Sequence, residues 1–422
     1  LSRPTNSHAN MLKKISVKQL TLGMHLKEFC GSWMEHPFWR NSFVLTNPKD
    51  IEAILASSIK EVWIDCNKGL DVAADVPTVS VAETEAQVDA ELNQIAESKR
   101  EIAPTPVAVE IERAAKICAQ AKRAVTSMFQ EARMGKAIDT GKAQQLVEEI
   151  SDSVLRNPGA LISLARLKNA DDYTYMHSVA VCALMIALAR QLQLDEETTR
   201  RLGLAGLLHD LGKAAMPMDV LNKPGKLSDG EFAIMKRHPD EGHKMLADAP
   251  GACPIALDVV LHHHEKIDGS GYPHGLKDTE ISLHAKMGAV CDVYDAITSN
   301  RPYKAGWDPA ESLRKMAEWA PGHFDPTVFQ AFVKSLGIYP IGSLVRLESG
   351  RLGVVVEQSE KSLLAPRVKV FFSTRANARI RTDVIDLSAP ACRDKIAQRE
   401  DPAQWRFPDL DALWSGLPGN PW

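Results

Sequence analysis

Apolar residues follow two different spacings along the chain, and the change between them divides it into three regions. From about residue 107 to residue 336 they recur every three to four positions, which is typical of helices that bury one face. Before and after that region, short β-branched runs stand between turn-forming residues. The pattern predicts a mainly α chain, in which a helical central domain is flanked by a small N-terminal α/β domain and a small C-terminal β domain.

The N-terminal region contains one clear strand and one clear helix. The run EVWID at residues 61–65 predicts the strand, and residues 48–58 predict the helix. We assign residues 11–71 to the small domain. Residues 72–106 are rich in Ala, Glu, Val, Thr and Pro without a sustained period, so we expect a linker with some nascent helix.

The segment GSWMEHPFWRNSF within the small domain is unusually aromatic. We expect Trp33, Phe38 and Trp39 to pack into a small core, because aromatic side chains bury large apolar areas. A surface that senses a ligand is the alternative.

Capping residues and β-branched runs place further elements. Asp139 or Thr140 can cap one helix, and Ser228 with Glu231 has the spacing of a capping box. Three β-branched runs follow the helices, at residues 343–347, 353–356 and 367–372. We therefore expect a helical domain over residues 107–338, a β domain over residues 339–390 and a tail over residues 391–422.

The composition is that of an ordinary globular protein. The chain has 422 residues, 45% of them apolar and 25% charged, which is enough for a sizeable core and two or three domains. The net charge of −4 argues against a nucleic-acid polymer as a partner, since such binding needs a basic surface. A small anion can still bind, because local cations can outweigh the overall charge.

The cysteines and the apolar runs indicate a cytoplasmic protein. The seven cysteines are scattered and form no CxxC pair, so we expect reduced thiols. No apolar run reaches the length of a membrane-spanning helix, and no signal peptide is recognisable. We expect residues 1–10, which precede Met11, to derive from an expression vector, and we leave them out of the fold prediction.

Histidines crowd into one part of the helical region: nine of the thirteen lie between His177 and His284. Several of them, with two aspartates, interrupt apolar helical stretches, where a lone imidazole or carboxylate would be costly to bury. A single buried histidine is more often a core residue with a satisfied hydrogen bond, but seven such residues together favour a metal site. The seven are His177, His209, Asp210, His238, His263, His264 and Asp292.

The ligand set combines imidazole and carboxylate without thiolate. It favours divalent transition metals, iron or manganese first and then nickel, cobalt or zinc, over a structural zinc or calcium site. Seven ligands exceed what one ion can take with an open position, so we expect two ions per chain. A pair about 3.5–4 Å apart can activate water and hold the oxygens of a phosphoryl group. Asp210 is the natural bridge, because a carboxylate has two oxygens.

Lys213 follows His209 by four residues and Asp210 by three, so on a helix it shares their face. A lysine there can pair with a phosphate or with the attacking oxygen. A solvated lysine at a helix end is the alternative.

Four motifs occur in order along this region: HD at 209–210, then HHEKIDGSGYP, DVYDAITS and RPYK. Together they resemble the HD-GYP domain, a bacterial class of cyclic di-GMP phosphodiesterase with an all-helical catalytic part of the HD superfamily. The resemblance covers roughly residues 107–336. Residues 11–70 also resemble a small domain of unknown function that often precedes this domain.

The resemblance implies a role for each candidate residue. His177, His209, Asp210 and Asp292 would hold one metal ion. Asp210, His238, His263 and His264 would hold the second, with Lys213 beside them. Tyr272 of the GYP loop, Arg301 and Lys304 would contact the nucleotide, and the residue types fit, since arginine and lysine bind phosphate oxygens.

One position departs from part of the family. Some members have a glutamate four residues before the first histidine, and it binds a third metal. Here that position is Tyr173, while Asp171 and Asp172 lie off the helical spacing. A centre of two metals is therefore the better prediction.

The expected reaction is the hydrolysis of one 3′,5′ phosphodiester of cyclic di-GMP, which gives linear pGpG and, on further hydrolysis, GMP. The alternatives are a phosphohydrolase for another nucleotide, a di-iron oxygenase, and a receptor that binds cyclic di-GMP with little turnover. Beyond cyclic di-GMP, the expected partners are a second copy of the chain or other signalling proteins.

Overall fold

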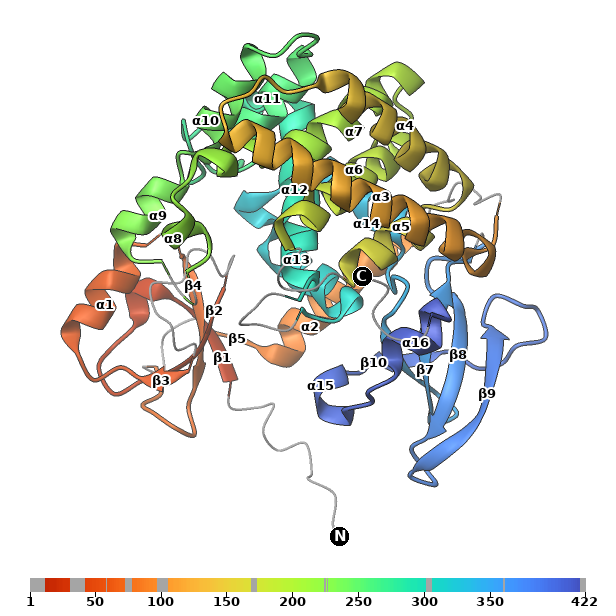
Figure 1. Ribbon diagram of the computed structural model, residues 1–422. Coiled ribbons are helices and arrows are strands. Elements are labelled where there is room, and N and C mark those ends of the chain that lie inside the picture. The colour runs from red at the N-terminus through yellow and green to blue at the C-terminus, as the bar shows by residue number, and fades with distance from the viewer. Residues whose placement is uncertain are drawn as a thin grey trace. The chain divides into compact units, whose positions relative to one another are not determined.

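The computed structural model describes most of the chain, and helix accounts for 55% of it. The described residues are 12–30, 42–57, 59–72, 78–96, 105–167, 173–223, 225, 227–300, 306–359 and 361–417. The chain divides into two compact units (Figure 1). One comprises the chain up to Glu91 together with Ala317–Trp319, and the other comprises Leu92–Met316 and the chain from Ala320 onward.

The N-terminal unit is built on a five-stranded antiparallel sheet with the order β3-β2-β4-β1-β5. Its strands are β1 (Leu12–Ser16), β2 (His25–Phe29), β3 (Phe43–Val44), β4 (Glu61–Asp65) and β5 (Val79–Ser80). The central strand β4 is the predicted EVWID run, and the helix predicted at residues 48–58 is α1 (Pro48–Leu55). Ile54 of α1 packs with Ile15, Leu26 and Ile64 in one apolar core. Both predictions are confirmed, whereas Trp33, Phe38 and Trp39 lie outside the described residues.

The expectation of a linker at residues 72–106 needs correction. After β5 the chain forms a helix of sixteen residues, α2 (Val81–Ala96). Thr84, Val88, Leu92 and Ile95 are buried, at the spacing of one helical face. Many Ala and Glu residues stand between these buried positions, so the helical spacing could not be recognised in the sequence.

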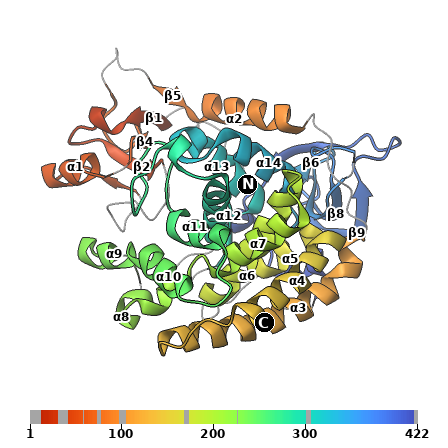
Figure 2. The same cartoon turned by 90° about the horizontal axis from the view of Figure 1, so that it is seen from above.

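The second unit is a bundle of helices in which α6 is central (Figure 2). Residues 176–189 of α6 are buried all round, which explains why that helix shows no polar face. It packs against α3, α5, α7 and α12. The helices of the bundle are α3 (Val107–Arg133), α4 (Thr140–Arg156), α5 (Pro158–Arg166), α6 (Tyr173–Gln191), α7 (Glu196–Leu208), η5 (Leu211–Ala215), α8 (Met218–Leu221), α9 (Asp229–Met235), α10 (His238–Ala247), α11 (Pro254–His262), α12 (Leu283–Thr298), α13 (Pro309–His323) and α14 (Pro326–Leu336).

The capping residues act as the sequence predicts. Asp139 caps α4 and accepts hydrogen bonds from the backbone of Gly141 and Lys142. Ser228 and Glu231 form a reciprocal capping box at the start of α9.

A second five-stranded antiparallel sheet follows the helices, with the order β10-β6-β7-β8-β9. Its strands are β6 (Leu344–Leu347), β7 (Arg351–Glu357), β8 (Arg367–Ser373), β9 (Ala378–Asp386) and β10 (Ile396–Arg399). The first three match the predicted β-branched runs. The assignment of residues 391–422 to a tail is wrong, because β10 pairs with β6 and the helices α15 (Pro402–Trp405) and α16 (Leu410–Ser415) follow it. Trp405 and Phe407 pack on one face of the sheet against Phe371 and Phe372.

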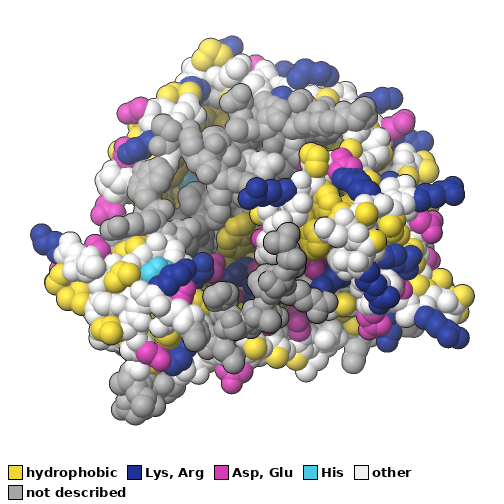
Figure 3. All heavy atoms as spheres, turned by 90° about the horizontal axis from the view of Figure 1, so that it is seen from below, with side chains coloured by type: hydrophobic (Ala, Val, Ile, Leu, Met, Phe, Trp, Pro, Cys, Tyr) yellow, Lys and Arg dark blue, Asp and Glu magenta, His cyan; other side chains and the backbone are white. Residues whose placement is uncertain are grey.

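The predicted fold class is therefore confirmed: along the chain, a small N-terminal α/β domain is followed by a helical bundle and then by a small C-terminal β domain. Among the described residues, no helix has both the length and the apolar character needed to cross a membrane. Basic and acidic side chains alternate with apolar ones on the face shown in Figure 3, so that face carries mixed charge.

One close backbone contact brings two parts of the bundle together. Gly212 of η5 faces the start of α10, where a Cβ atom would lie 1.8 Å from the carbonyl oxygen of His238 and 2.4 Å from the backbone nitrogen of Gly242. Both partners are backbone atoms that cannot turn aside. Any side chain at residue 212 would therefore push η5 away from α10.

We expect Gly212→Ala to lower the free energy of unfolding by about 1–3 kcal/mol or more, because overpacking forces the backbone to shift. Gly230→Ala is the matched control: no atom lies within 4 Å of its added methyl group, and the change should be close to neutral. Thermal unfolding followed by circular dichroism measures both. Equal stability of the two variants would contradict the close packing of η5 on α10.

Candidate metal centre

The seven candidate ligands come from five helices and from the turns at their ends. His177 lies in α6 and Asp292 in α12, whereas the other five lie at helix ends. His209 and Asp210 join α7 to η5, His238 opens α10, and His263 and His264 follow α11. Although they are spread over 116 positions of sequence, the fold buries them together.

The structure gathers these side chains into two groups. In each group, one nitrogen or oxygen atom per residue lies within 4.8 Å of the others. One group is Asp210, His238, His263 and His264, and the other is His177, His209 and Asp292. The family resemblance implied the same division of the histidines and Asp292, with Asp210 in both sets, whereas here Asp210 belongs to the first group.

Asp210 stands between the two groups. Its Oδ2 lies 3.6 Å from Nε2 of His177 and 3.5 Å from Nε2 of His209. Its Oδ1 lies 3.3 Å from Nε2 of His238 and 3.9 Å from Nε2 of His263. Each oxygen therefore faces a different group, as in a carboxylate that bridges two ions.

The outer hydrogen bonds of the histidines fix which nitrogen faces inward. Nδ1 of His209 donates to the carbonyl oxygen of Gly206 at 2.8 Å, and Nδ1 of His238 donates to that of Met235 at 2.8 Å. Nδ1 of His263 donates to the carbonyl oxygens that precede it in α11. A carbonyl oxygen can only accept, so in the neutral rings the unprotonated Nε2 points into the centre.

This arrangement fits metal ions and is unfavourable without cations. The unprotonated Nε2 atoms of His238 and His263 face each other at 3.4 Å, which brings two lone pairs together. The buried Oδ1 atom of Asp210 has no hydrogen-bond partner. A buried acceptor without a donor costs free energy, and a cation between these atoms removes that cost. The imidazole and carboxylate donors suit the divalent transition metals expected from the sequence.

The carboxylates of the centre are ionised. Burial alone would raise the pKa of Asp210, but the neighbouring Lys213 and His209 hold it well below its usual range. Burial acts in the same way on Asp292, and there the hydrogen bond with His177 holds the pKa well below its usual range. Both side chains can therefore act as anionic ligands near neutral pH.

Most of the imidazoles are neutral. Burial lowers the pKa of His238 to about 4 and that of His263 to about 3, and it lowers the pKa of His264 well below its usual range. For His177 burial also acts to lower the pKa, but hydrogen bonds with Asp292 and Asp295 outweigh it and raise the pKa. A metal ion therefore competes with a proton more strongly at His177 than at His238, His263 and His264.

Lys213 lies where the sequence analysis places it, although not on an α-helix. The chain turns into the 3-10 helix η5 after Asp210, and in that geometry residues three apart stand on the same side. The ammonium group of Lys213 pairs with Oδ2 of Asp210, and its side chain is about one-fifth exposed. It can therefore neutralise the charge of Asp210 and still reach a bound anion.

Asp295 is a residue of the centre that the sequence analysis missed. Its Oδ2 accepts a hydrogen bond from Nδ1 of His177 at 2.6 Å, and its Oδ1 accepts one from the hydroxyl of Ser299 at 3.2 Å. Both carboxylate oxygens are thus engaged, and Nε2 of His177 is turned toward Asp292. The signal was present in DVYDAITS, where two aspartates three residues apart share one helical face.

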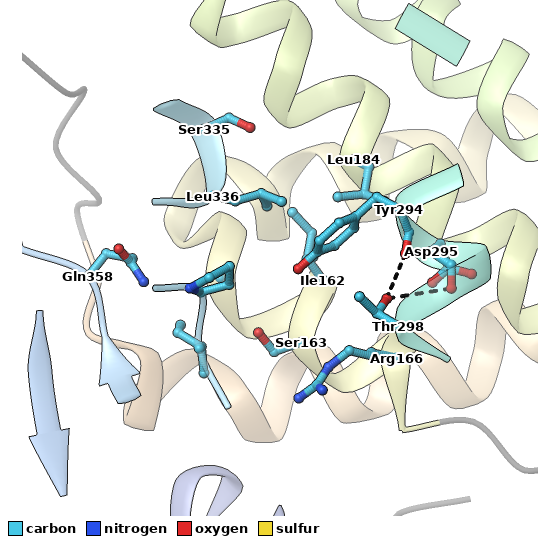
Figure 4. A pocket seen from close by; sticks show the side chains of 13 residues that line it. Ile162, Ser163, Arg166, Leu184, Tyr294, Asp295, Thr298, Ser335, Leu336 and Gln358 are labelled. Atoms are coloured by element: carbon cyan, nitrogen blue, oxygen red, sulfur yellow. Dashed lines mark hydrogen bonds between the residues drawn. The ribbon is translucent and has the colours of Figure 1, made fainter. Parts of the chain in front are cut away.

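A pocket lies beside this hydrogen-bonded pair (Figure 4). It is lined by Asp295 and Thr298 of α12, by Ser163 and Arg166 of α5, and by Ser335 and Leu336 of α14. None of the seven candidate ligands lines it, so it is distinct from the metal centre.

The GYP loop is held against the centre by two contacts. The ring of Tyr272 stacks on that of His264, with the centroids 4.6 Å apart. Glu265, buried and also missed by the sequence analysis, accepts hydrogen bonds from the backbone nitrogens of His274, Gly275 and Leu276 at 2.7, 3.1 and 3.0 Å. The carboxylate thereby ties the loop to the end of α11.

Gly271 of the loop is required by a close approach. A Cβ atom there would lie 2.4 Å from the backbone nitrogen of Lys266 and 2.6 Å from the carbonyl oxygen of His264. The loop can therefore fold back beside His264 only with glycine at this position.

Some residues named in the sequence analysis lie outside the part of the chain that the structure describes. Arg301 and Lys304 lie outside the described residues, and so does the side chain of Tyr173. Their roles stay predictions.

The fold and the buried histidine–aspartate cluster define an HD-domain protein. Residues 151–328 match the HD domain family, and residues 12–143 match a domain of unknown function, DUF3391. The chain is 56% identical, over 96% of each sequence, to the protein named cyclic di-GMP phosphodiesterase PA4108 from Pseudomonas aeruginosa. It therefore belongs to the HD-GYP family, as the motifs predicted.

Other matches are less similar and cover less of this chain. A protein named 3'3'-cGAMP-specific phosphodiesterase 1 from Vibrio cholerae is 36% identical over 39% of this chain and 38% of its own. The solved structure of Bd1817, an HDG"Y"P protein from Bdellovibrio bacteriovorus, is similar with a TM-score of 0.44 and 17% identity, over 76% of this chain and 98% of that chain.

We expect Asp295→Asn to weaken metal binding by about 10- to 100-fold, the usual effect of losing a partner that orients a metal-binding histidine. Asp258→Asn is the matched control, because Asp258 pairs in the same way with His262, at 2.9 Å, outside the cluster. Competition with a chelator of known affinity measures both variants. Equal metal affinity of the two would contradict the role of Asp295.

Proposed function

We propose that this protein is a metal-dependent phosphodiesterase that hydrolyses cyclic di-GMP to linear pGpG, which further hydrolysis converts to GMP. The observation that carries the proposal is the position of Asp210, with one oxygen toward each group of histidines. The 56% identity to a protein named as a cyclic di-GMP phosphodiesterase supports the choice of substrate.

In this proposal the centre holds two divalent ions, iron or manganese first, with nickel, cobalt or zinc as the other candidates. His177, His209, Asp210 and Asp292 hold one, and Asp210, His238, His263 and His264 hold the other. When bound, such ions supply an activated water and neutralise charge on the phosphoryl oxygens. The number of ligands supports two ions, because seven exceed the needs of one ion with an open position.

The chain's own residues position the substrate and the water. Asp210 and Lys213 form a partly buried ion pair whose ammonium group can also reach a phosphoryl oxygen. Tyr272 offers a ring and a hydroxyl beside His264, and Glu265 holds the backbone of its loop in place. Arg301 and Lys304 are proposed to bind phosphate oxygens, a role that rests on the RPYK motif.

The reaction adds water across one P–O3′ bond of the cyclic dinucleotide. The oxygen of the water joins phosphorus, the bond from phosphorus to the ribose 3′ oxygen breaks, and that oxygen takes a proton. The product is a linear dinucleotide with a 5′ phosphate. Burial of the centre favours this chemistry, because charge interactions are stronger where water is excluded.

A related cyclic dinucleotide is the second candidate substrate. The similarity to a protein named as specific for 3'3'-cGAMP favours it, although that similarity covers only 39% of the chain. The two substrates differ in one base and share both phosphodiester bonds. Discrimination between them must therefore come from contacts to the base.

We expect the metal-loaded protein to convert cyclic di-GMP to pGpG, and Asp210→Ala to abolish that conversion. Loss of the carboxylate removes the ligand shared by both groups, while the helices around it remain packed. Chromatography of the products, with circular dichroism as the check on folding, tests both statements. Asp258→Ala, outside the cluster, is the control and should keep its activity.

Near-normal turnover by Asp210→Ala would contradict the proposed metal centre. Faster turnover of 3'3'-cGAMP than of cyclic di-GMP by the wild-type protein would instead overturn the choice of substrate and keep the centre. Tight binding of cyclic di-GMP by the metal-loaded protein without any product would favour the alternative that the protein is a receptor for cyclic di-GMP and not an enzyme.

A further inference from the structure

Beyond the metal ligands and the GYP loop, a lysine on a neighbouring helix extends the site. We propose that Lys236, at the end of α9, binds the second phosphate of the cyclic dinucleotide, the one that does not react. The inference rests on the proposed function and adds a residue that selects a substrate with two phosphodiesters.

A continuous stack of side chains leads from the centre to Lys236. Tyr272 lies with one face on His264, at 4.6 Å between ring centroids. Phe232 of α9 meets Tyr272 edge to face, with the centroids 6.5 Å apart. The ammonium nitrogen of Lys236 lies 5.6 Å from the centroid of Tyr272 and 4.7 Å from that of Phe232. The two rings therefore hold the cation beside the site.

The backbone at Lys236 is also fixed with respect to the centre. Lys236 caps the C-terminus of α9, whose start is held by the capping box of Ser228 and Glu231. Two residues later His238 enters the cluster of ligands. The position of the lysine is thus tied to the metal centre by a connection of only two residues.

Lys236 differs from the other cations around it in having no acidic partner. Lys223 pairs with Glu231, while Arg237 and Lys244 both pair with Glu241. No carboxylate pairs with Lys236 in the part of the chain that the structure describes, and its side chain is exposed. An exposed ammonium group without a carboxylate partner is a point charge that can pair with an incoming anion.

The chemistry of the substrate suits such a cation. A cyclic dinucleotide carries two phosphodiesters in one ring, each with one negative charge. When one of them lies at the metals, the other must lie to one side, away from the buried ligands. Among the described candidate ligands, only His264 has the ring of a tyrosine stacked on it. Lys236 places a positive charge beside that tyrosine, Tyr272. We therefore assign it to the second phosphate and not to the reacting one.

The test compares two substrates that differ in the second phosphate. Cyclic di-GMP has two phosphodiesters, whereas bis(p-nitrophenyl) phosphate has one. We expect Lys236→Met, which keeps the length and the apolar contacts of the side chain, to raise KM for cyclic di-GMP about ten-fold, the usual effect of losing one charge-assisted hydrogen bond. The loss of kcat/KM should be about ten-fold larger for cyclic di-GMP than for the small substrate.

Two further variants separate charge from structure. Lys236→Arg keeps the charge and should restore most of the affinity for cyclic di-GMP. Lys244→Met removes an exposed lysine that pairs with Glu241, and it should leave both substrates unaffected.

Equal losses for the two substrates, or no change in KM for cyclic di-GMP, would overturn the role of Lys236. Failure of the proposed function looks different: the wild-type protein would then hydrolyse the small diester but not cyclic di-GMP.

Discussion

The structure depends on one buried carboxylate, that of Asp210. An ionised group without compensation is among the most costly things a protein interior can hold, and here five imidazoles and a second carboxylate surround it. Lys213 balances one charge, but Oδ1 of Asp210 keeps no hydrogen-bond donor. The cluster is therefore built for cations, and the fold around it serves to keep its members in place.

The surrounding helices meet that requirement through their ends. Helix ends leave backbone carbonyls without partners, and His209, His238 and His263 use those carbonyls to orient their rings. Gly212 allows η5 to touch α10, which brings Asp210 to His238. Asp295 does for His177, within a helix, what the carbonyls do elsewhere. The same hydrogen bonds thus give the carbonyls at the helix ends a partner and orient the rings of the histidines.

Much of the fold could be predicted, because apolar spacing reports burial directly. The strand at residues 61–65 and the capping box at Ser228 have the expected positions. The seven candidate ligands could be chosen because each interrupts an apolar stretch, and the structure gathers them into two groups. Local sequence patterns predict burial less well where a residue is covered by residues far away in the sequence. Trp405 and Phe407 read as part of a tail until the sheet that they cover is known.

The missed residues of the site share one property: they act through a partner that only the fold supplies. Asp295 and Glu265 are buried carboxylates whose partners are a histidine from another helix and the backbone of a loop. Lys236 looks like any exposed lysine until Tyr272 is found beneath it. No spacing rule connects residues 236 and 272, so contacts of this kind could not be predicted from the sequence.

The central proposal is that the centre holds two metal ions with Asp210 between them, and anomalous X-ray diffraction from crystals of the metal-loaded protein tests it most directly. Data collected at the absorption edge of the loaded metal should show two peaks about 3.5–4 Å apart, one beside each oxygen of Asp210. One should lie among His177, His209 and Asp292, and the other among His238, His263 and His264. A single peak, three peaks at full occupancy, or peaks away from Asp210 would contradict the account.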